Sequence, residues 1–373
     1  MTDENVQNFR TNLDPEGIDS FDSDDHSEAP PTDIVAFNEL RSCADLFRLE
    51  KRGLLDLQPT FQRDFVWSNT AQTRFIDSLI KGLPIPSMCF AHDWKRDEYQ
   101  VIDGLQRIST IVKFLDETVK WKLAKDEDIE PKIAGKFVSE IRDGSKNIRK
   151  FYDRLENITI PVTILRCDME KTSHSEYVFT IFHRLNTGGS KLNNQEIRNC
   201  IYNGSLNQLL AKLDTYIPWR SLNKMDEESN YRYTKQELIL RLFAFHHKYQ
   251  KYSGRLSKFL NEYMKTYRNA DDRFLADKEQ LFIETIDITY DKVFRGEAPE
   301  KINISIIEAV LVGVASNLEY LKALPSSECV DKYTKLVNLE PFSAEKLKEG
   351  LSGKPRVIER MQTAIDVFSP DGY

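Results

Sequence analysis

The chain has 373 residues but only five cysteines, and these are widely separated in sequence. They are Cys43, Cys89, Cys167, Cys200 and Cys329. Their number is odd and no two form a Cys-x-x-Cys pair, which argues against a disulfide framework and against a zinc site. We therefore expect reduced, mostly buried thiols.

The sequence also lacks long hydrophobic runs. No apolar stretch approaches the roughly 18–20 residues that a membrane-spanning helix needs. The first ten residues, MTDENVQNFR, are acidic and polar and contain no hydrophobic region of a signal peptide. Hydrophobic residues make up 40% of the chain and charged residues 30%, as in globular proteins. We expect a cytoplasmic protein with no membrane partner.

Several catalytic motifs are absent. The chain has no Gly-x-x-x-x-Gly-Lys-Ser/Thr, so it is not a Walker-type NTPase. Neither Gly-x-Ser-x-Gly nor His-Glu-x-x-His occurs. There is no long block of lysine and arginine, so charge alone does not argue for DNA binding.

The net charge of −7 is concentrated at the N-terminus. Residues 1–33 contain ten acids and a single base, Arg10, so this segment carries −9 and the remainder +2. The segment has few apolar residues to offset the entropy of ordering, and we predict a disordered acidic tail. It either solubilises the protein or docks on a basic surface of a partner.

The rest of the chain has two parts. Residues 34–205 mix strand and helix patterns, while no clear strand follows residue 205. In the first part we predict a helix from Ser42, a strand at 54–57, a helix between Ser68 and Gly82, an extended run at 88–91, a strand at 99–102, helical pieces within 131–156, a strand at 158–165, a helix at 172–184 and a helix from Asn193. Pro161 suggests that the strand at 158–165 is an edge strand or contains a bulge.

In the second part we predict helices at 206–213, 234–250, 254–268, 274–294, 301–324, 330–337, 343–349 and 354–367. The fold class is therefore α+β: a small mixed sheet with helices at 34–205, then an all-helical domain at 206–373.

The stretch from Tyr99 to Leu115 carries the strongest signal of a site. It begins with β-branched residues, breaks at the turn dipeptide Asp103-Gly104, and continues with helical periodicity. Five polar residues cluster where the strand passes into the helix: Asp103, Gln106, Arg107, Ser109 and Thr110. A helix N-terminus has unpaired N–H groups and the positive end of the helix dipole, so it suits an anion such as phosphate. The alternative is a purely structural turn in which Arg107 pairs with a nearby acid.

Two further polar groups lie at predicted element boundaries. One is Gln62-Arg63, and the other runs from Arg184 through Asn186 and Gly188 to Glu196 and Arg198. The planar guanidinium of arginine suits bidentate binding of phosphate. If Arg63, Arg107 and either Arg184 or Arg198 converge, they would hold a polyphosphate. Asp103 or Glu196 would then supply a carboxylate for Mg²⁺, which binds phosphates together with one or two carboxylates.

The three groups taken together, in this order, resemble the N-terminal domain of the GmrSD-type modification-dependent restriction endonucleases. The resemblance covers about residues 38–205 and implies a ParB/sulfiredoxin-like fold. The hallmark of that family is Asp-Gly-Gln-Gln-Arg, and this chain has Leu105 in place of the first glutamine.

The resemblance implies nucleotide binding and, in relatives, NTP hydrolysis coupled to DNA restriction and anti-phage defence. By position, it places Gln62, Arg63, Asp103, Gln106, Arg107 and Asn186 in the nucleotide pocket. With the polar residues described above, the predicted site comprises Asp103, Gln106 and Arg107 as catalytic residues; Gln62, Arg63, Ser109, Thr110, Arg184, Asn186, Gly188 and Arg198 as nucleotide-binding residues; and Asp103 and Glu196 as metal ligands.

Full-length relatives often add a C-terminal His-Me finger nuclease domain, whose chemistry needs a histidine general base. The last histidine here is His247, inside a predicted amphipathic helix, and 126 residues follow it. We expect that this chain lacks such a domain and that a separate nuclease subunit cuts DNA.

Three functions remain open at this point. The leading one is a nucleotide-binding, NTP-hydrolysing component of a restriction or defence system, with Mg²⁺ as cofactor. The alternative is a non-catalytic DNA-binding or sensor module that uses the same arginines on DNA phosphates, with a steep salt dependence. The third, a DNA nuclease, needs a metal-bound carboxylate cluster, for which Asp103 and Glu196 are the candidates. A homo-oligomer is compatible with each.

Overall fold

The computed structural model describes residues 30–57, 67–185, 193–225, 234–348 and 350–372. The chain divides into two compact units, an N-terminal unit up to residue 192 and a helical unit from residue 193. This division falls before the expected boundary at 205. Asp33, the last residue of the predicted acidic tail, is bonded within the N-terminal unit, where it forms an ion pair with Lys171 and a hydrogen bond with His174.

Over its described residues, the N-terminal unit contains a five-stranded sheet and six helices. The strands are β1 (Val35–Ser42), β2 (Leu55–Asp56), β3 (Met88–Asp93), β4 (Glu98–Asp103) and β5 (Thr159–Cys167). The helices are α2 (Cys43–Lys51), α3 (Asn69–Lys81), α4 (Leu105–Leu115), α5 (Val138–Arg142), α6 (Lys146–Asn157) and α7 (Thr172–Leu185).

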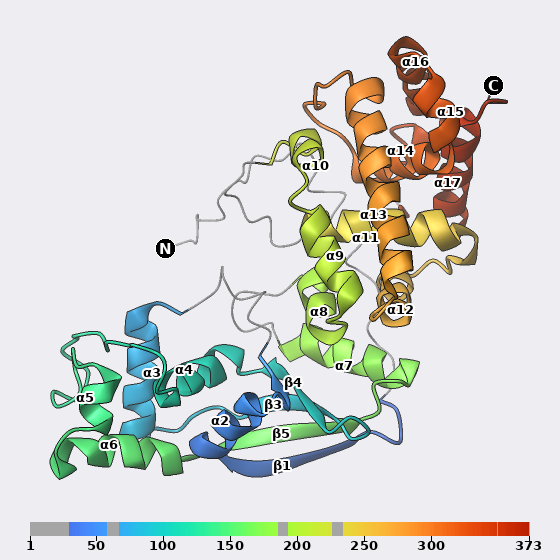
Figure 1. Ribbon diagram of the computed structural model, residues 1–373. Helices are drawn as coiled ribbons and strands as arrows, with labels where there is room; N and C mark the ends of the chain where they lie inside the picture. The colour runs from blue at the N-terminus through green and yellow to red at the C-terminus, as the bar shows by residue number, and fades with distance from the viewer. Residues whose placement is uncertain (1–29, 58–66, 186–192, 226–233, 349, 373) are drawn as a thin grey trace. The chain divides into compact units, whose positions relative to one another are not determined.

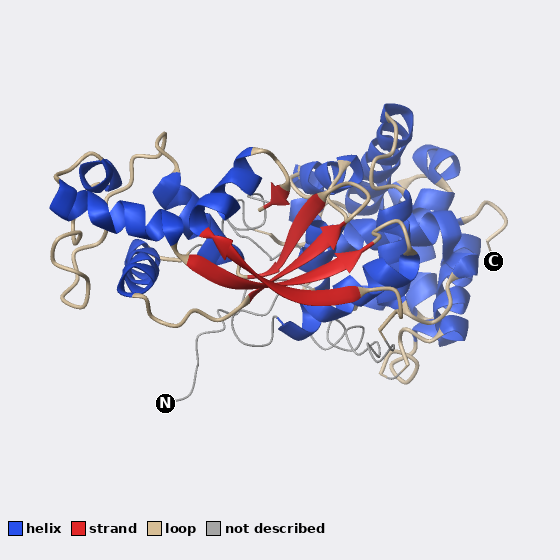
Figure 2. Ribbon diagram, turned by 90° about the horizontal axis from the view of Figure 1, so that it is seen from below, coloured by secondary structure: helices blue, strands red, loops and turns tan. Residues whose placement is uncertain are grey.

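The sheet is mixed, with the order β1-β5-β3-β4-β2. β1 pairs antiparallel with β5, β5 parallel with β3, β3 antiparallel with β4, and β4 parallel with β2. The strands are strongly twisted across one another (Figure 2). Together with the helical second unit, this confirms the predicted α+β class.

Two details of the sheet differ from the sequence prediction. The strand β1 was not predicted, because Val35–Ser42 mixes apolar and polar residues without the alternation of a half-buried strand. β5 is not an edge strand but lies between β1 and β3. Pro161 is tolerated there because it pairs with Leu40 of β1 while the register with β3 begins only at Val162.

Both faces of the sheet are buried. On one face, Phe90 and Val162 join a hydrophobic core with Leu46 of α2, Ile76 of α3 and Ile108 of α4. Consecutive strand residues point to opposite faces, so the buried Ile102 next to Val101 belongs to the other face. Helix α7 packs against β4, the strand that leads into the candidate site.

Over its described residues, the helical unit is built from ten α-helices and three short helical turns of other types. The α-helices are α8 (Asn194–Ile201), α9 (Ser205–Leu213), α10 (Ile217–Leu222), α11 (Thr234–Lys248), α12 (Leu256–Thr266), α13 (Asp272–Asp287), α14 (Ile304–Ser316), α15 (Leu318–Ala323), α16 (Ser326–Val337) and α17 (Lys354–Phe368), and a π-helical turn, η4 (Ile288–Val293), extends α13. Two 3-10 turns, η3 (Tyr249–Lys251) and η5 (Glu340–Phe342), complete the set. In the parts of the chain that the structure describes, no helix is long and apolar enough to cross a membrane.

Most predicted helices are present, with three differences. The helix predicted at 301–324 is divided at Asn317, whose amide donates to the carbonyls of Gly313 and of Ile365 in α17. The segment predicted as a helix at 343–349 forms turns over its described residues, 343–348. The short helix α10 was not predicted.

Helices α14 and α17 approach each other closely at Gly313. A Cβ atom built on Gly313 would lie 2.7 Å from the carbonyl oxygen of Ala364 and 2.7 Å from Cδ2 of Phe368. Real Cβ atoms do not come this close to backbone atoms, so the absence of a side chain is what allows this packing.

We predict that Gly313→Ala lowers the free energy of unfolding by about 1–3 kcal/mol, because the added methyl group forces α14 and α17 apart. Urea denaturation followed by circular dichroism measures the change. The matched control is Ser316→Ala, an exposed position on the same helix, with an expected change within about 0.5 kcal/mol. A more stable Gly313→Ala variant, as the higher helix propensity of alanine alone would give, contradicts the close packing.

Candidate functional site

The candidate site lies at the turn from β4 to α4, and Gly104 shapes it. Gly104 has φ +99°, a left-handed conformation that side chains rarely adopt. A Cβ atom at this position would lie 2.7 Å from Cγ of Met88, the first residue of β3. The turn therefore presses its backbone against β3, and only glycine satisfies both the conformation and the space.

The polar centre of the turn is an ion pair between Asp103 and Arg107. Arg107 Nη2 donates to Asp103 Oδ2 at 2.6 Å, and Arg107 Nη1 donates to the backbone carbonyl of Pro86 at 2.5 Å. The Arg107 side chain is 13% exposed and that of Asp103 43%. The two bonds fix the guanidinium across the turn, while much of the carboxylate remains open to solvent.

The N-terminus of α4 has no side-chain cap, since its N-cap residue is Gly104. The first turn of the helix contains no acidic residue. A helix leaves its first N–H groups without partners inside the helix, and these groups carry the positive end of the dipole. The turn thus combines helix N-terminal N–H groups, which no side chain among the described residues caps, with the nearby Arg107.

Gln106 connects this turn to the preceding polar motif. Its Oε1 accepts a hydrogen bond of 3.1 Å from the backbone N–H of Trp67. Gln62 and Arg63 lie outside the described residues, but both flanks of their segment are bonded to the site. On the other flank, β2 pairs with β4, with Asp56 opposite Gln100.

The other polar residues of α4 have different environments. Thr110 is buried, and its hydroxyl donates to the carbonyl of Gln106 at 2.7 Å, so its contribution is to the helix. Ser109 is partly exposed. Leu105 is partly buried against the hydrophobic core, which explains an apolar residue at this position.

Of the third predicted motif, Asn186 and Gly188 lie outside the described residues. Arg184 is exposed near the C-terminal end of α7, the helix that packs against β4.

Glu196 and Arg198 belong to the helical unit, where both are buried. The carboxylate of Glu196 accepts a hydrogen bond of 2.7 Å from the N–H of Asn193, and the Asn193 side chain accepts one from the N–H of Glu196. This is a capping box at the start of α8, as the spacing predicted.

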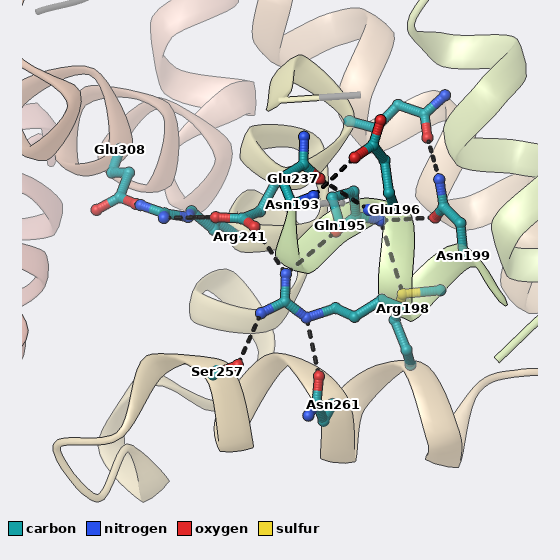
Figure 3. A network of polar contacts seen from close by, with 12 residues as sticks. Asn193, Gln195, Glu196, Arg198, Asn199, Glu237, Arg241, Ser257, Asn261 and Glu308 are labelled. Carbon is teal, nitrogen blue, oxygen red and sulfur yellow. Dashed lines mark hydrogen bonds and ion pairs between the residues drawn. The ribbon is translucent and has the colours of Figure 1, made fainter. Parts of the chain in front are cut away.

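The guanidinium of Arg198, only 1% exposed, lies at the centre of a polar network (Figure 3). It donates to Glu237 at 2.7 Å, to Asn261 at 2.9 Å and to Ser257 at 3.2 Å. These partners come from α11 and α12, so Arg198 holds three helices of its own unit together.

The network continues from Glu237 to a second buried pair. Arg241 donates to Glu237 at 2.6 Å and to Glu308 of α14 at 2.5 Å. Burial alone would raise the pKa of Glu237, but the charges of Arg241 and Arg198 outweigh it and hold this pKa at about 2. The two arginines and two glutamates neutralise each other, as buried charges require.

The structure thus brings three of the predicted residues together at one turn: Asp103, Gln106 and Arg107. Glu196, Arg198 and Thr110 form hydrogen bonds within their own helices or with neighbouring helices, and these bonds give the three residues a structural role. No group of three or more His, Cys, Asp or Glu side chains that could hold a metal occurs among the described residues. A magnesium ion at the turn would have Asp103 as its carboxylate ligand, an arrangement that suits an ion carried by phosphates.

Sequence reasoning missed three parts of the site, namely the Pro86 carbonyl that accepts from Arg107, Met88 beneath Gly104, and the Trp67 N–H bonded to Gln106. Two of these are backbone groups, which any residue type provides. Pro84 and Pro86 were a usable signal, because prolines exclude a helix here and leave backbone carbonyls available to other donors.

These features define an α+β domain with a strand–turn–helix site that suits an anion. Residues 43–203 match the family model of the GmrSD restriction endonuclease N-terminal domain, which confirms the resemblance expected from the three motifs. The match ends close to the expected boundary at 205 and includes α8. No curated protein and no solved structure matches the chain.

We predict that Gly104→Ala destabilises the protein more than Gly53→Ala does. Both glycines have positive φ, +99° and +68°, but a Cβ at Gly53 would have nothing within 4 Å. The control therefore carries only the conformational strain, about 1–2 kcal/mol, whereas Gly104→Ala adds about 1–3 kcal/mol from the clash with Met88. Urea denaturation of both variants measures the difference, and equal losses would disprove the close approach to β3.

We predict that Glu237→Gln lowers the free energy of unfolding by about 3–5 kcal/mol at pH 7, because it leaves Arg198 and Arg241 buried together without their shared anion. The folded-state pKa of Glu237 is lowered from 4.5 to about 2, so its stabilisation is complete above 4.5 and disappears as the pH falls toward 2. The difference in the free energy of unfolding between wild type and Glu237→Gln must therefore shrink as the pH falls from 4.5 toward 2.

The control for this prediction is Glu279→Gln, which breaks the exposed pair of Glu279 with Lys212. Its expected effect is within about 0.5 kcal/mol at any of these pH values. A pH-independent loss for Glu237→Gln would show that the carboxylate is not ionised in the network.

Proposed function

We propose that the turn from β4 to α4 binds the phosphates of a nucleotide, and that the chain acts as a nucleotide-binding component of a DNA restriction or anti-phage defence system. The observation that carries this proposal is the position of Arg107. It is fixed by Asp103 and the Pro86 carbonyl at the uncapped N-terminus of α4.

The donors of Arg107 support phosphate binding. A guanidinium has five N–H donors, and Arg107 uses two of them. Within the described part of the chain the other three have no partner. Because the side chain is already fixed, little conformational entropy is lost when an anion binds to these donors.

The carboxylate of Asp103 supports a role for Mg²⁺. Only its Oδ2 atom is engaged by Arg107, and the side chain is nearly half exposed. When bound with the nucleotide, Mg²⁺ would neutralise phosphate charge beside this carboxylate. Asp103 would hold the ion and orient Arg107 at the same time.

The match of residues 43–203 to this family model supports a role in restriction and defence. We propose that hydrolysis of the nucleotide is slow, because Leu105 packs against the core where a polar residue stands in the family hallmark. A separate nuclease subunit would then cut the DNA. The alternative, a DNA-binding sensor, uses the same arginine on backbone phosphates.

We predict that the purified protein binds at least one of the four NTPs or four dNTPs in the presence of Mg²⁺, and that Arg107→Ala weakens this binding at least ten-fold. The variant loses the fixed guanidinium at the helix N-terminus. Isothermal titration calorimetry with each nucleotide measures the affinities, and phosphate release measures hydrolysis.

The matched control is Arg149→Ala on α6. Arg149 pairs with Asp153 four residues away, as Arg107 does with Asp103, but it lies outside the turn. Absence of heat with all eight nucleotides, or equal losses in the two variants, contradicts nucleotide binding at this turn. A gel-shift titration with DNA at two salt concentrations then tests the sensor alternative, which predicts a steep loss of affinity at the higher one.

A further inference from the structure

The two edges of the sheet differ in length. The edge strand β2 has two residues, Leu55–Asp56, whereas the opposite edge strand, β1, has eight. Figure 1 shows β1 as the outermost strand of the N-terminal unit. A long edge strand is unusual in a stable fold, because its unpaired backbone groups form a template for another strand.

The backbone pattern shows which groups face outward. The N–H of Cys43 donates to the carbonyl of Ile158, which continues the register of β1 with β5. Hydrogen-bonded pairs alternate along an antiparallel ladder, so residues 35, 37, 39 and 41 bond to β5. The N–H and C=O groups of Ala36, Asn38 and Leu40 therefore point to the outer edge of the sheet, where no other described strand pairs with β1.

β1 has few of the features that usually protect an edge, apart from the charged residues Glu39 and Arg41. It contains no proline, lysine or glycine, and its register with β5 is unbroken. Three of its apolar side chains are exposed: Val35 at 53%, Phe37 at 42% and Leu40 at 69%. A further β-strand would satisfy the outward backbone groups and shield part of these side chains.

We propose that β1 pairs antiparallel with β1 of a second copy of the chain, with Asn38 on the two-fold axis. When the two strands are centred on Asn38, residues 35–41 of one copy lie opposite residues 41–35 of the other. All three outward-facing residues of each copy then take part in the pairing. Ala36 then lies opposite Leu40 of the partner, and each Asn38 lies opposite the other. If the register of the two strands shifts by two residues in either direction, one outward-facing residue of each strand lies opposite a residue outside 35–41.

The charges of β1 favour its own copy as the occupant. The strand has one acid and one base, Glu39 and Arg41, whose side chains are bonded to each other at 2.5 Å. Two copies of β1 therefore meet without net charge repulsion. A strongly charged strand would find no opposite net charge on this edge.

Asn38 is suited to the axis. Its Oδ1 accepts a hydrogen bond of 2.8 Å from Thr163 Oγ1, which fixes the side chain. Within the described residues its amide N–H₂ has no partner. Across a two-fold axis this donor faces the amide oxygen of the other Asn38, which has a second lone pair.

This interface is independent of the proposed nucleotide site. β1 is separated from β4 by β5 and β3, and it precedes the residues that match the family model. Pairing would continue the sheet from one copy into the next and leave the turn at Gly104 open. The failure of either proposal therefore does not affect the other.

The test combines the oligomeric state with a register-specific cross-link. We expect sedimentation equilibrium of the full chain at tens of micromolar to show a dimer. In oxidising buffer, Asn38→Cys should form a disulfide-linked dimer, because the Cα atoms of a hydrogen-bonded pair lie about 5.5 Å apart. The five native cysteines are buried and do not compete.

The matched control is Ala36→Cys on the same edge. In the proposed register the two introduced thiols of this variant lie four positions apart along the paired strands, about 14 Å, and cannot be bridged. Leu40→Lys should raise the dimer dissociation constant at least ten-fold while leaving the folded circular dichroism spectrum unchanged. A monomeric wild-type chain, a dimer that Leu40→Lys leaves intact, or equal cross-linking of the Ala36→Cys and Asn38→Cys variants would overturn the proposal.

Discussion

The absence of a side chain at position 104 is the constraint on which the candidate site depends. β4 pairs with β3 up to Asp103, and α4 begins at Leu105, so one residue must reverse the chain direction. Gly104 does so in a left-handed conformation, with its backbone against Met88. This brings Asp103 and Arg107, four residues apart, to the same side of the turn, and it leaves the helix N-terminus without a cap.

Arg107 and Arg198 show how one sequence signal leads to two environments. Both lie in the first two turns of a helix, and both suit phosphate by residue type. Arg107 keeps three N–H donors without partners among the described residues, whereas Arg198 is enclosed by Glu237, Asn261 and Ser257. The difference comes from residues on α11 and α12, far away in sequence.

This also explains how much could be predicted from the sequence. Helix caps and turns are local, so the capping box at Asn193, the cap at Ser42 and the strand–turn–helix around Gly104 were predicted correctly. The α+β class followed from these local elements. The place of β5 inside the sheet and the strand β1 were not predicted, since both depend on pairing between residues more than a hundred positions apart.

The position of the site in the sheet connects its chemistry to its stability. β4 is an inner strand, and its two neighbours each contribute to the turn that follows it. β3 supplies Met88 beneath Gly104, β2 pairs with β4, and the N–H of Trp67 donates to Gln106. An arginine held in this way is positioned before any ligand arrives, because the sheet and not the ligand fixes the carbonyl and carboxylate that it binds. Such preorganisation is what allows a small number of charged groups to bind an anion in competition with water.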